Sequence, residues 1–201
     1  MELTGTTIVI TGAASGIGAA LARRCADERP ANLVLADRDI EGAGAVVRSI
    51  EDGVSGQCVA WSLDVGREGA NEAFIAEVEA NIGPIDLFVA NAGIATGASE
   101  QGDDATWDAI WDINTMAHVR SARAHIPLWL ERGGGYLLTT ASAAGLLTNL
   151  GDAPYSVTKA AAVAFAEWIS ITYGDRGIKV SCLCPQGVQT PLLFPPGPDG
   201  E

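Results

Sequence analysis

The sequence Thr11-Gly12-Ala13-Ala14-Ser15-Gly16-Ile17-Gly18 follows an apolar run at residues 6–10 and leads directly into an alanine-rich segment. Glycines at these positions let the backbone turn sharply and let a pyrophosphate approach without meeting Cβ atoms. The free N–H groups and the positive dipole end of the following helix favour the same phosphates. A strand, a glycine turn and a helix in this order predict a dinucleotide site, with Gly12, Ser15, Gly16, Ile17 and Gly18 around the phosphates.

Short apolar runs alternate with longer helical stretches over the rest of the chain. Nearly continuous apolar runs suit strands that are covered on both faces, and helices of crossover length between them imply that the strands are parallel. The sequence therefore predicts an α/β fold, a single Rossmann-like domain with a doubly wound parallel sheet of six strands and helices on both faces. The expected strands are 6–10, 32–36, 57–63, 85–90, 135–141 and 178–184, and the expected helices are 16–28, 39–52, 67–82, 104–131 and 153–175.

The last eleven residues differ in composition from the rest. Four prolines, at positions 191, 195, 196 and 198, exclude a helix or a central strand there. We therefore expect a dinucleotide-binding and catalytic domain over residues 1–190 and a flexible tail rich in Pro and Gly over residues 191–201.

Composition excludes several classes of partner. The chain has 201 residues, with 12 Lys and Arg against 25 Asp and Glu, for a formal net charge of −13. This acidic balance argues against nucleic acid and anionic membranes as partners, because both require a basic face. The amino terminus lacks the basic start and apolar run of a signal peptide, and no apolar run approaches the ~20 residues of a membrane span. We predict a cytoplasmic protein.

The cysteines fit that compartment. No two of them form a C-x-x-C pair, so we expect small buried hydrophobic side chains rather than disulfides or metal ligands. They are Cys25, Cys58, Cys182 and Cys184.

Asp37 and Arg38 end the second expected strand, about twenty residues beyond the glycines. An acid at this place can accept hydrogen bonds from the adenosine ribose, and it repels a 2′-phosphate. Asp37 therefore favours NAD over NADP. Arg38 favours the opposite choice if its guanidinium pairs with that phosphate, and a solvated loop pair is the alternative for both residues.

Tyr155 and Lys159 are four residues apart at the start of the last expected helix, so they share one face. A neighbouring ammonium and a bound cationic nicotinamide both favour a phenolate, which suits proton transfer at neutral pH. An exposed pair on a helix surface is the alternative.

Two further polar residues accompany this pair. Ser142 follows the fifth expected strand, where its hydroxyl could donate to a substrate oxygen or could cap a turn before Gly145. Asn114 lies in the middle of a long expected helix, where asparagine is mildly unfavourable, so a local kink, a water site or a surface position would explain it.

In these motifs the chain resembles a classical short-chain dehydrogenase/reductase over nearly all of its length. The resemblance implies a catalytic tetrad in which Tyr155 is the acid/base, Lys159 holds the nicotinamide ribose and tunes Tyr155, and Ser142 orients the substrate oxygen. Asn114 would sustain a water relay that ends at Lys159. The implied cofactor contacts also include Asp64 and Val65 at the adenine, Asn91, Ala92 and Gly93 along the groove, and Pro185, Val188 and Thr190 at the nicotinamide.

The sequence departs from the family pattern at two places. Gln186 stands where the family has glycine, so we expect either that the turn uses Gly187 or that the nicotinamide end sits differently. The chain also lacks the substrate loop, the further helix and the seventh strand that family members usually have after this point. We expect these 201 residues to be part of a longer chain, with the tail as the start of the substrate loop.

Other side chains are expected to be structural. His118 and His125 lack an acid or a cysteine at ligand spacing, so we predict no metal site. The tryptophans at 107, 111, 129 and 168 should pack in or between the two long helices. The apolar segment 160–166 needs cover on two sides, which predicts a homodimer or homotetramer through helices 104–131 and 153–175.

The sequence as a whole predicts an NAD-dependent oxidoreductase that interconverts a small-molecule secondary alcohol and a ketone through Tyr155. Two alternatives stay open: a non-catalytic NAD(P)-binding sensor or scaffold, and an NADP-dependent carbonyl reductase. The sequence does not identify the substrate.

Overall fold

The computed structural model of the protein describes residues 1–194. The predicted flexible tail therefore lies outside the described residues from residue 195 onward. Its first four residues form a turn, in which the N–H groups of Leu193 and Phe194 donate to the carbonyl of Thr190.

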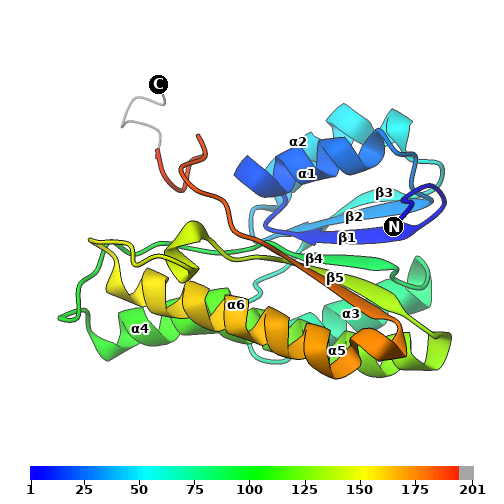
Figure 1. Cartoon of the computed structure of the whole chain (residues 1–201). Helices are drawn as coiled ribbons and strands as arrows, with labels where there is room; N and C mark the ends of the chain where they lie inside the picture. The colour runs from blue at the N-terminus through cyan, green and yellow to red at the C-terminus, as the bar shows by residue number, and fades with distance from the viewer. Residues whose placement is uncertain (195–201) are drawn as a thin grey trace.

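A single parallel sheet of six strands forms the centre of the fold, in the order β3-β2-β1-β4-β5-β6 (Figure 1). The order reverses its direction at β1, so a crevice is expected beyond the carboxyl ends of β1 and β4. The predicted doubly wound α/β fold is confirmed. The strands are β1 (Thr7–Thr11), β2 (Asn32–Asp37), β3 (Cys58–Ser62), β4 (Leu87–Ala90), β5 (Gly135–Thr140) and β6 (Ile178–Leu183).

Helices cover both faces of this sheet, as Figure 1 shows, with α1 and α2 on one face and α3 to α6 on the other. Side chains alternate along β1: Ile8 and Ile10 belong to the core cluster under α1 and α2, whereas Val9 belongs to the cluster under the other helices. The helices are α1 (Gly16–Ala26), α2 (Ile40–Ile50), α3 (Ala70–Asn81), α4 (Asp104–Trp111), α5 (Ala117–Arg132) and α6 (Ala153–Tyr173).

The predicted helix over 104–131 is correct in extent but not continuous in type. A π-helical turn, Asp112–Met116, joins α4 to α5. The predicted helix over 67–82 starts later, at Ala70, because Gly69 has a left-handed backbone (φ +76°). Short 3-10 turns occupy Glu51–Gly53, Ala143–Gly145 and Gly174–Arg176.

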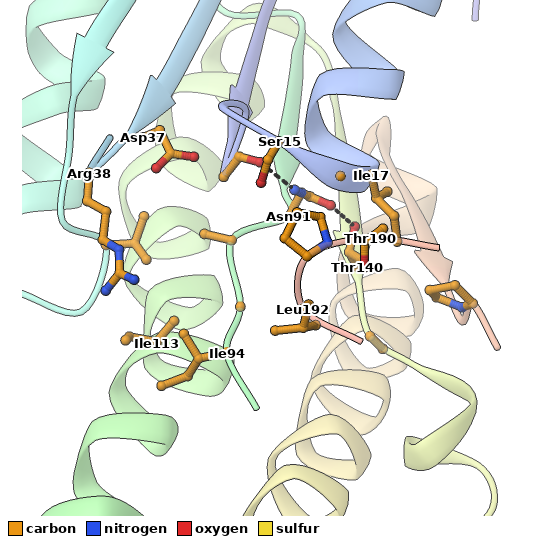
Figure 2. A pocket seen from close by; sticks show the side chains of 18 of the residues that line it. Ser15, Ile17, Asp37, Arg38, Asn91, Ile94, Ile113, Thr140, Thr190 and Leu192 are labelled. Carbon is orange, nitrogen blue, oxygen red and sulfur yellow. Dashed lines mark hydrogen bonds between the residues drawn. The ribbon is translucent and has the colours of Figure 1, made fainter. Parts of the chain in front are cut away.

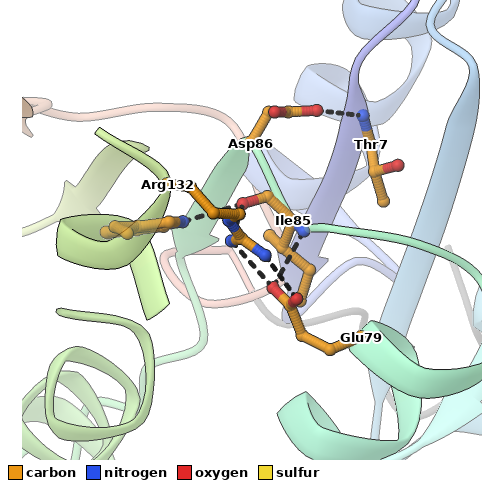
Figure 3. A network of polar contacts seen from close by, with 6 residues as sticks. Thr7, Glu79, Ile85, Asp86 and Arg132 are labelled. Atoms are coloured by element: carbon orange, nitrogen blue, oxygen red, sulfur yellow. Dashed lines mark hydrogen bonds and ion pairs between the residues drawn. The ribbon is translucent and has the colours of Figure 1, made fainter. Parts of the chain in front are cut away.

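A polar network fastens α3 and α5 to the chain just before β4, at the amino end of the sheet (Figure 3). The guanidinium of Arg132 donates to the carboxylate of Glu79 at 2.5 and 3.0 Å, and Glu79 also accepts from the N–H of Ile85. The indole N–H of Trp129 donates to the carbonyl of Ile85 at 2.7 Å. These contacts lie at the opposite edge from the predicted site, so we assign them to stability.

Two packing predictions are partly wrong. Trp129 is fully buried, but Trp111 and Trp168 are 41% and 55% exposed. Of the four cysteines only Cys25 is buried; Cys58, Cys182 and Cys184 are half-buried, and all four thiols are free. Among residues 1–194, no helix has the length and apolarity that a membrane span requires.

Candidate active site

A groove of about 260 Å³ runs over the carboxyl ends of the strands (Figure 2). Nearly all of the predicted cofactor residues line it, and the exceptions are Gly18 and Val188. The predicted residues in the lining are Gly12, Ser15, Gly16, Ile17, Asp37, Arg38, Asp64, Val65, Asn91, Ala92, Gly93, Tyr155, Lys159, Pro185 and Thr190.

The glycine turn leaves no room for side chains. A Cβ on Gly18 would lie 2.0 Å from the carbonyl oxygen of Gly12, and a Cβ on Gly12 would lie 2.8 Å from the Cα of Ala92. Gly18 therefore packs α1 against the turn and does not line the groove. Gly12 and Gly16 also have left-handed backbones, with φ of +64° and +54°.

The N-terminus of α1 is open to an anion. Ser15 is its N-cap residue, but no side chain caps the first N–H groups, and the first turn contains no acid. Uncapped N–H groups and the positive end of the helix dipole are features that favour an anion beside the glycine turn.

Asp37 lies at the far end of the same groove, next to Arg38 (Figure 2). The carboxylate of Asp37 accepts from the N–H of Ala14 at 3.0 Å and from the N–H of Asp39 at 2.9 Å. It thus holds the glycine turn in place and keeps lone pairs for further donors. Arg38 is exposed, and so is Asp64, whose carboxylate accepts from Gly66; Val65 is buried.

Asn91 ties three strands together at the floor of the groove. Its side-chain amide donates to the carbonyls of Thr11 (3.0 Å) and Gly12 (3.1 Å), and its oxygen accepts from the hydroxyl of Thr140 at 3.1 Å (Figure 2). The amide is therefore committed to the chain itself. Asn91 shapes the groove through these contacts more than it offers polar atoms to a ligand.

Tyr155 and Lys159 lie together at the other end of the groove, with the ammonium 5.6 Å from the centre of the Tyr155 ring. The side chain of Lys159 is buried and donates to the carbonyl of Thr140 at 2.9 Å. Burial removes water from the ammonium and lowers the pKa of Lys159 to about 8, although the thiols of Cys182 and Cys184 act in the opposite direction. The alternative of an exposed surface pair is wrong for Lys159.

Asn114 is fully buried within the π-helical turn. Its side-chain oxygen accepts from the N–H of Ile94 at 2.9 Å, and its amide donates to the carbonyl of Ile94 at 2.9 Å and to the hydroxyl of Thr158 at 3.2 Å. A Cβ on Gly93 would lie 3.1 Å from the Lys159 ammonium and 3.2 Å from the Asn114 oxygen, so the two side chains flank Gly93. Of the explanations left open for Asn114, a surface position is wrong, and the structure has a π-helical turn at this residue.

A second pocket, of about 500 Å³, adjoins the groove, and Tyr155 lines both, as do Ile17, Pro185, Thr190 and Leu192. Ser142 lines this pocket, while its hydroxyl oxygen accepts from the N–H of Ala144 at 3.1 Å. The turn-capping alternative for Ser142 is therefore correct, and it is compatible with a place beside Tyr155. Val188 lines this pocket rather than the groove.

In the segment after β6, residues 184–194 contain no left-handed backbone conformation. Among residues 1–194, Arg29 is the one non-glycine residue with positive φ, and Gly187 is not among the positive-φ glycines. A left-handed turn at Gly187, the first of the two alternatives for Gln186, is therefore wrong, and a different seat for the nicotinamide end stays a prediction. Glutamine at position 186 fits without backbone strain, and Pro185 and Thr190 both line the groove.

Asp152, the N-cap residue of α6, was not among the residues predicted from the sequence. Its buried carboxylate accepts from the N–H groups of Thr96 (2.7 Å), Gly97 (2.7 Å) and Tyr155 (3.0 Å), and from the hydroxyl of Thr96 (2.9 Å). Burial opposes ionisation, but these hydrogen bonds together lower the pKa of Asp152. An acid just before an expected helix was the signal available in the sequence.

His118 and His125 are buried, and their ring nitrogens have no hydrogen-bond partner within the described chain. Burial, with a smaller contribution from nearby cations, lowers the pKa of each to about 3, so both rings are neutral. The His125 ring stacks on Trp129 at 4.6 Å between centroids. Over residues 1–194, no group of three or more His, Cys, Asp and Glu side chains is arranged to hold a metal ion.

Comparison with known proteins identifies relatives across nearly the whole chain. The sequence model of the family described as short chain dehydrogenase matches residues 6–196. A 3beta-hydroxysteroid dehydrogenase from Mediterraneibacter gnavus is 33% identical over 188 residues, which cover 92% of this chain and 67% of the relative.

Solved structures of similar proteins share the fold. A short chain dehydrogenase/reductase from Burkholderia phymatum in complex with NAD has a TM-score of 0.87 at 29% identity, over 96% of this chain and 69% of that one. A short-chain dehydrogenase from Sphingobium yanoikuyae in complex with NADPH has a TM-score of 0.85 at 28% identity, over 93% and 73% of the two chains.

Proposed function

This chain belongs to the short chain dehydrogenase family, whose members are oxidoreductases, and we propose that it interconverts a secondary alcohol and a ketone with NAD as its redox partner. The observation that carries the proposal is the position of Tyr155. It lines both the groove over the glycine turn and the second pocket, so this residue lies where the two adjoin.

The groove fits a nicotinamide dinucleotide. Side chains at Gly12 and Gly18 would fill the turn, and the uncapped start of α1 offers N–H groups to a pyrophosphate. The carboxylate of Asp37 can accept from ribose hydroxyls, and the Lys159 ammonium retains donors beyond its bond to Thr140. Proteins of similar structure bind NAD or NADPH, which supports the same class of ligand here.

The residues at the junction have separable roles in the proposed reaction. The bound nicotinamide would supply or accept the hydride. Tyr155 donates its hydroxyl proton to the substrate oxygen in reduction and takes it back in oxidation. Lys159 stabilises the phenolate left behind, Ser142 orients the substrate oxygen, and Asn114 holds the loop at Ile94 beside Lys159.

Asp37 supports NAD rather than NADP. Its carboxylate lines the groove and would repel a 2′-phosphate, whereas the exposed Arg38 next to it would attract one. Fluorescence titration with NADH and NADPH distinguishes the two. We expect NADH to bind more tightly; tighter binding of NADPH would assign the protein to the NADP-dependent carbonyl reductases.

The substitution Tyr155→Phe tests the proposed reaction, because it removes one hydroxyl and keeps the ring. We expect turnover of secondary alcohols with NAD⁺ to fall by at least ~10³-fold, while NADH affinity changes little. A variant that keeps its turnover would remove Tyr155 from the mechanism. If the unaltered protein binds NADH tightly but oxidises none of a broad panel of alcohols and reduces none of the matching ketones, the non-catalytic sensor is the better description.

We also propose that the protein assembles as a homodimer or homotetramer through helices 104–131 and 153–175, and that it acts in the cytoplasm. Trp111, Trp168 and Ile171 are exposed on these helices, and large apolar side chains in such positions favour a covered face. The free thiols support a reducing compartment. Sedimentation analysis should report a dimer or a tetramer; a monomer at micromolar concentration would contradict the assembly.

A further inference from the structure

The second pocket differs from the cofactor groove in its chemistry. Asp37, Arg38, Asp64 and Lys159 line the groove. In the second pocket, Tyr155 is the sole ionisable residue of the described lining. The other lining residues are apolar, or are neutral hydrogen-bonding residues such as Thr148 and Asn149. An anionic substrate would therefore find no cation there to offset its desolvation, in a protein of net charge −13.

Large exposed apolar side chains occur in two of the chain segments that contribute to this pocket. One group lies in the segment after β5, where Leu146, Leu147 and Leu150 are 62%, 70% and 92% exposed. The other lies after β6, where Leu193 and Phe194 are 52% and 62% exposed. Exposure of an apolar side chain to water costs free energy, so the ones that line a pocket favour an apolar ligand there.

Two of these side chains reach the pocket itself. Leu147 and Leu193 both line it, and so does Tyr155. Tyr155 and Ser142 line the same pocket and could both meet one substrate oxygen, and the leucines are available to the rest of a substrate. Leu150 belongs to the same segment as Leu147 but does not line the pocket, so it serves as a matched control.

We propose that the substrate is an uncharged ketone or secondary alcohol with a large apolar carbon skeleton, and that Leu147 and Leu193 select it. The proposal rests on the proposed function and names the substrate class of the same site. A volume of about 500 Å³ lies within the range of pockets that enclose whole small molecules. The neutral lining among the described residues argues against hydroxy acids, sugar phosphates and nucleotide-linked thioesters as good substrates.

A homologous series of substrates tests this class directly. We would measure kcat/KM with NADH for 2-alkanones from butanone to undecanone, and for keto acids that carry a terminal carboxylate at the same length. Each added methylene that enters the pocket should raise kcat/KM by roughly threefold to fourfold. A terminal carboxylate should lower it by at least ~10-fold. A flat series, or a preference for the keto acids, would overturn the proposal and leave the proposed function standing.

Variants then locate the selection. Leu147→Asn and Leu193→Asn should flatten the dependence on chain length while NADH affinity stays unchanged, and Leu150→Asn should leave the series as it is. Leu147→Lys should give a higher kcat/KM for the keto acid than for the ketone of the same length. If Leu150→Asn alters the series as strongly as the other two, or if the variants change only the oligomeric mass, the leucines do not select substrate and the proposal fails. Inactivity of the unaltered protein toward every ketone would instead contradict the proposed function.

Discussion

Asp152→Ala is the substitution for which the structure gives the most complete expectation. The carboxylate of Asp152 accepts four hydrogen bonds, from the N–H and hydroxyl of Thr96 and from the N–H groups of Gly97 and Tyr155. It thereby joins the loop after β4 to the first turn of α6. A second contact between the same segments, from the N–H of Ala153 to the carbonyl of Ala98 (2.9 Å), stays intact in the variant.

The magnitude follows from the groups that lose their acceptor. Loss of a helix N-cap costs ~0.5–2 kcal/mol, and a hydrogen bond to a charged group contributes ~1.5–3 kcal/mol. Gly97 is exposed, so water replaces part of what the loop loses. We therefore expect the free energy of unfolding to fall by ~3–4 kcal/mol, which lowers Tm by roughly 6–16 °C in a chain of this size.

Thermal unfolding followed by circular dichroism measures the effect, and pH dependence identifies its origin. Because the pKa of Asp152 is lowered in the folded state, the ionised carboxylate stabilises the protein above the pKa of the unfolded side chain (~3.9). That contribution disappears as pH falls through the lower folded-state pKa. The difference in Tm between the unaltered protein and Asp152→Ala should accordingly have its full size at pH 7 and shrink below about pH 4.

Asp152→Asn gives a matched comparison. An amide oxygen can still cap Tyr155, but the NH₂ group would face the N–H donors of Thr96 and Gly97, so we expect an intermediate loss of ~1–3 kcal/mol. A Tm for Asp152→Ala within ~2 °C of the unaltered protein would refute the reasoning, since the four bonds would then contribute nothing. A Tm difference that does not depend on pH would equally contradict an ionised carboxylate as the stabilising group.

Three further substitutions have definite outcomes. Gly18→Ala places a Cβ 2.0 Å from the carbonyl oxygen of Gly12, so α1 must shift away from the turn. NADH affinity should fall by roughly tenfold in a fluorescence titration, and unchanged affinity would contradict a role of the glycine turn in binding. Lys159→Met removes a side chain whose pKa is about 8 in the folded state and ~10.4 in the unfolded state, so the free energy of unfolding should rise with pH between these values in the unaltered protein but not in the variant. Urea titrations at several pH values measure this, and the same pH dependence in both proteins would assign it to another group. Gly135→Ala places a Cβ 2.2 Å from the Trp129 ring, so we expect the free energy of unfolding to fall by at least ~3 kcal/mol. A fall below ~1 kcal/mol would show that the indole can move to accommodate the methyl group.

The fold and most of the groove were predictable from the sequence because local patterns determine them. Apolar runs of strand length, separated by helices, leave few arrangements other than a parallel sheet, and the turn from Thr11 to Gly18 places the ligand at its carboxyl edge. Tyr155 and Lys159 share a face through helix geometry alone.

What the sequence did not reveal depends on contacts between distant segments. The π-helical turn around Asn114 is stabilised by hydrogen bonds to Ile94 and Thr158, neither of which is a local neighbour. Gln186 has no positive φ, so the family's glycine at this position was a misleading guide to its backbone. Helical periodicity also does not show whether another element covers an apolar face, so the exposure of Trp168 could not be predicted from the sequence.

The most direct test of the proposed reaction is transfer of isotope from cofactor to product. An apolar ketone such as 2-nonanone would be reduced with NADH carrying two deuterium atoms at C4 of the nicotinamide, and the alcohol analysed by mass spectrometry. We predict that the unaltered protein forms alcohol one mass unit heavier at the carbinol carbon, and that Tyr155→Phe forms almost none. Alcohol without deuterium, or as much deuterated alcohol from Tyr155→Phe as from the unaltered protein, would contradict a reaction at the junction of the two pockets.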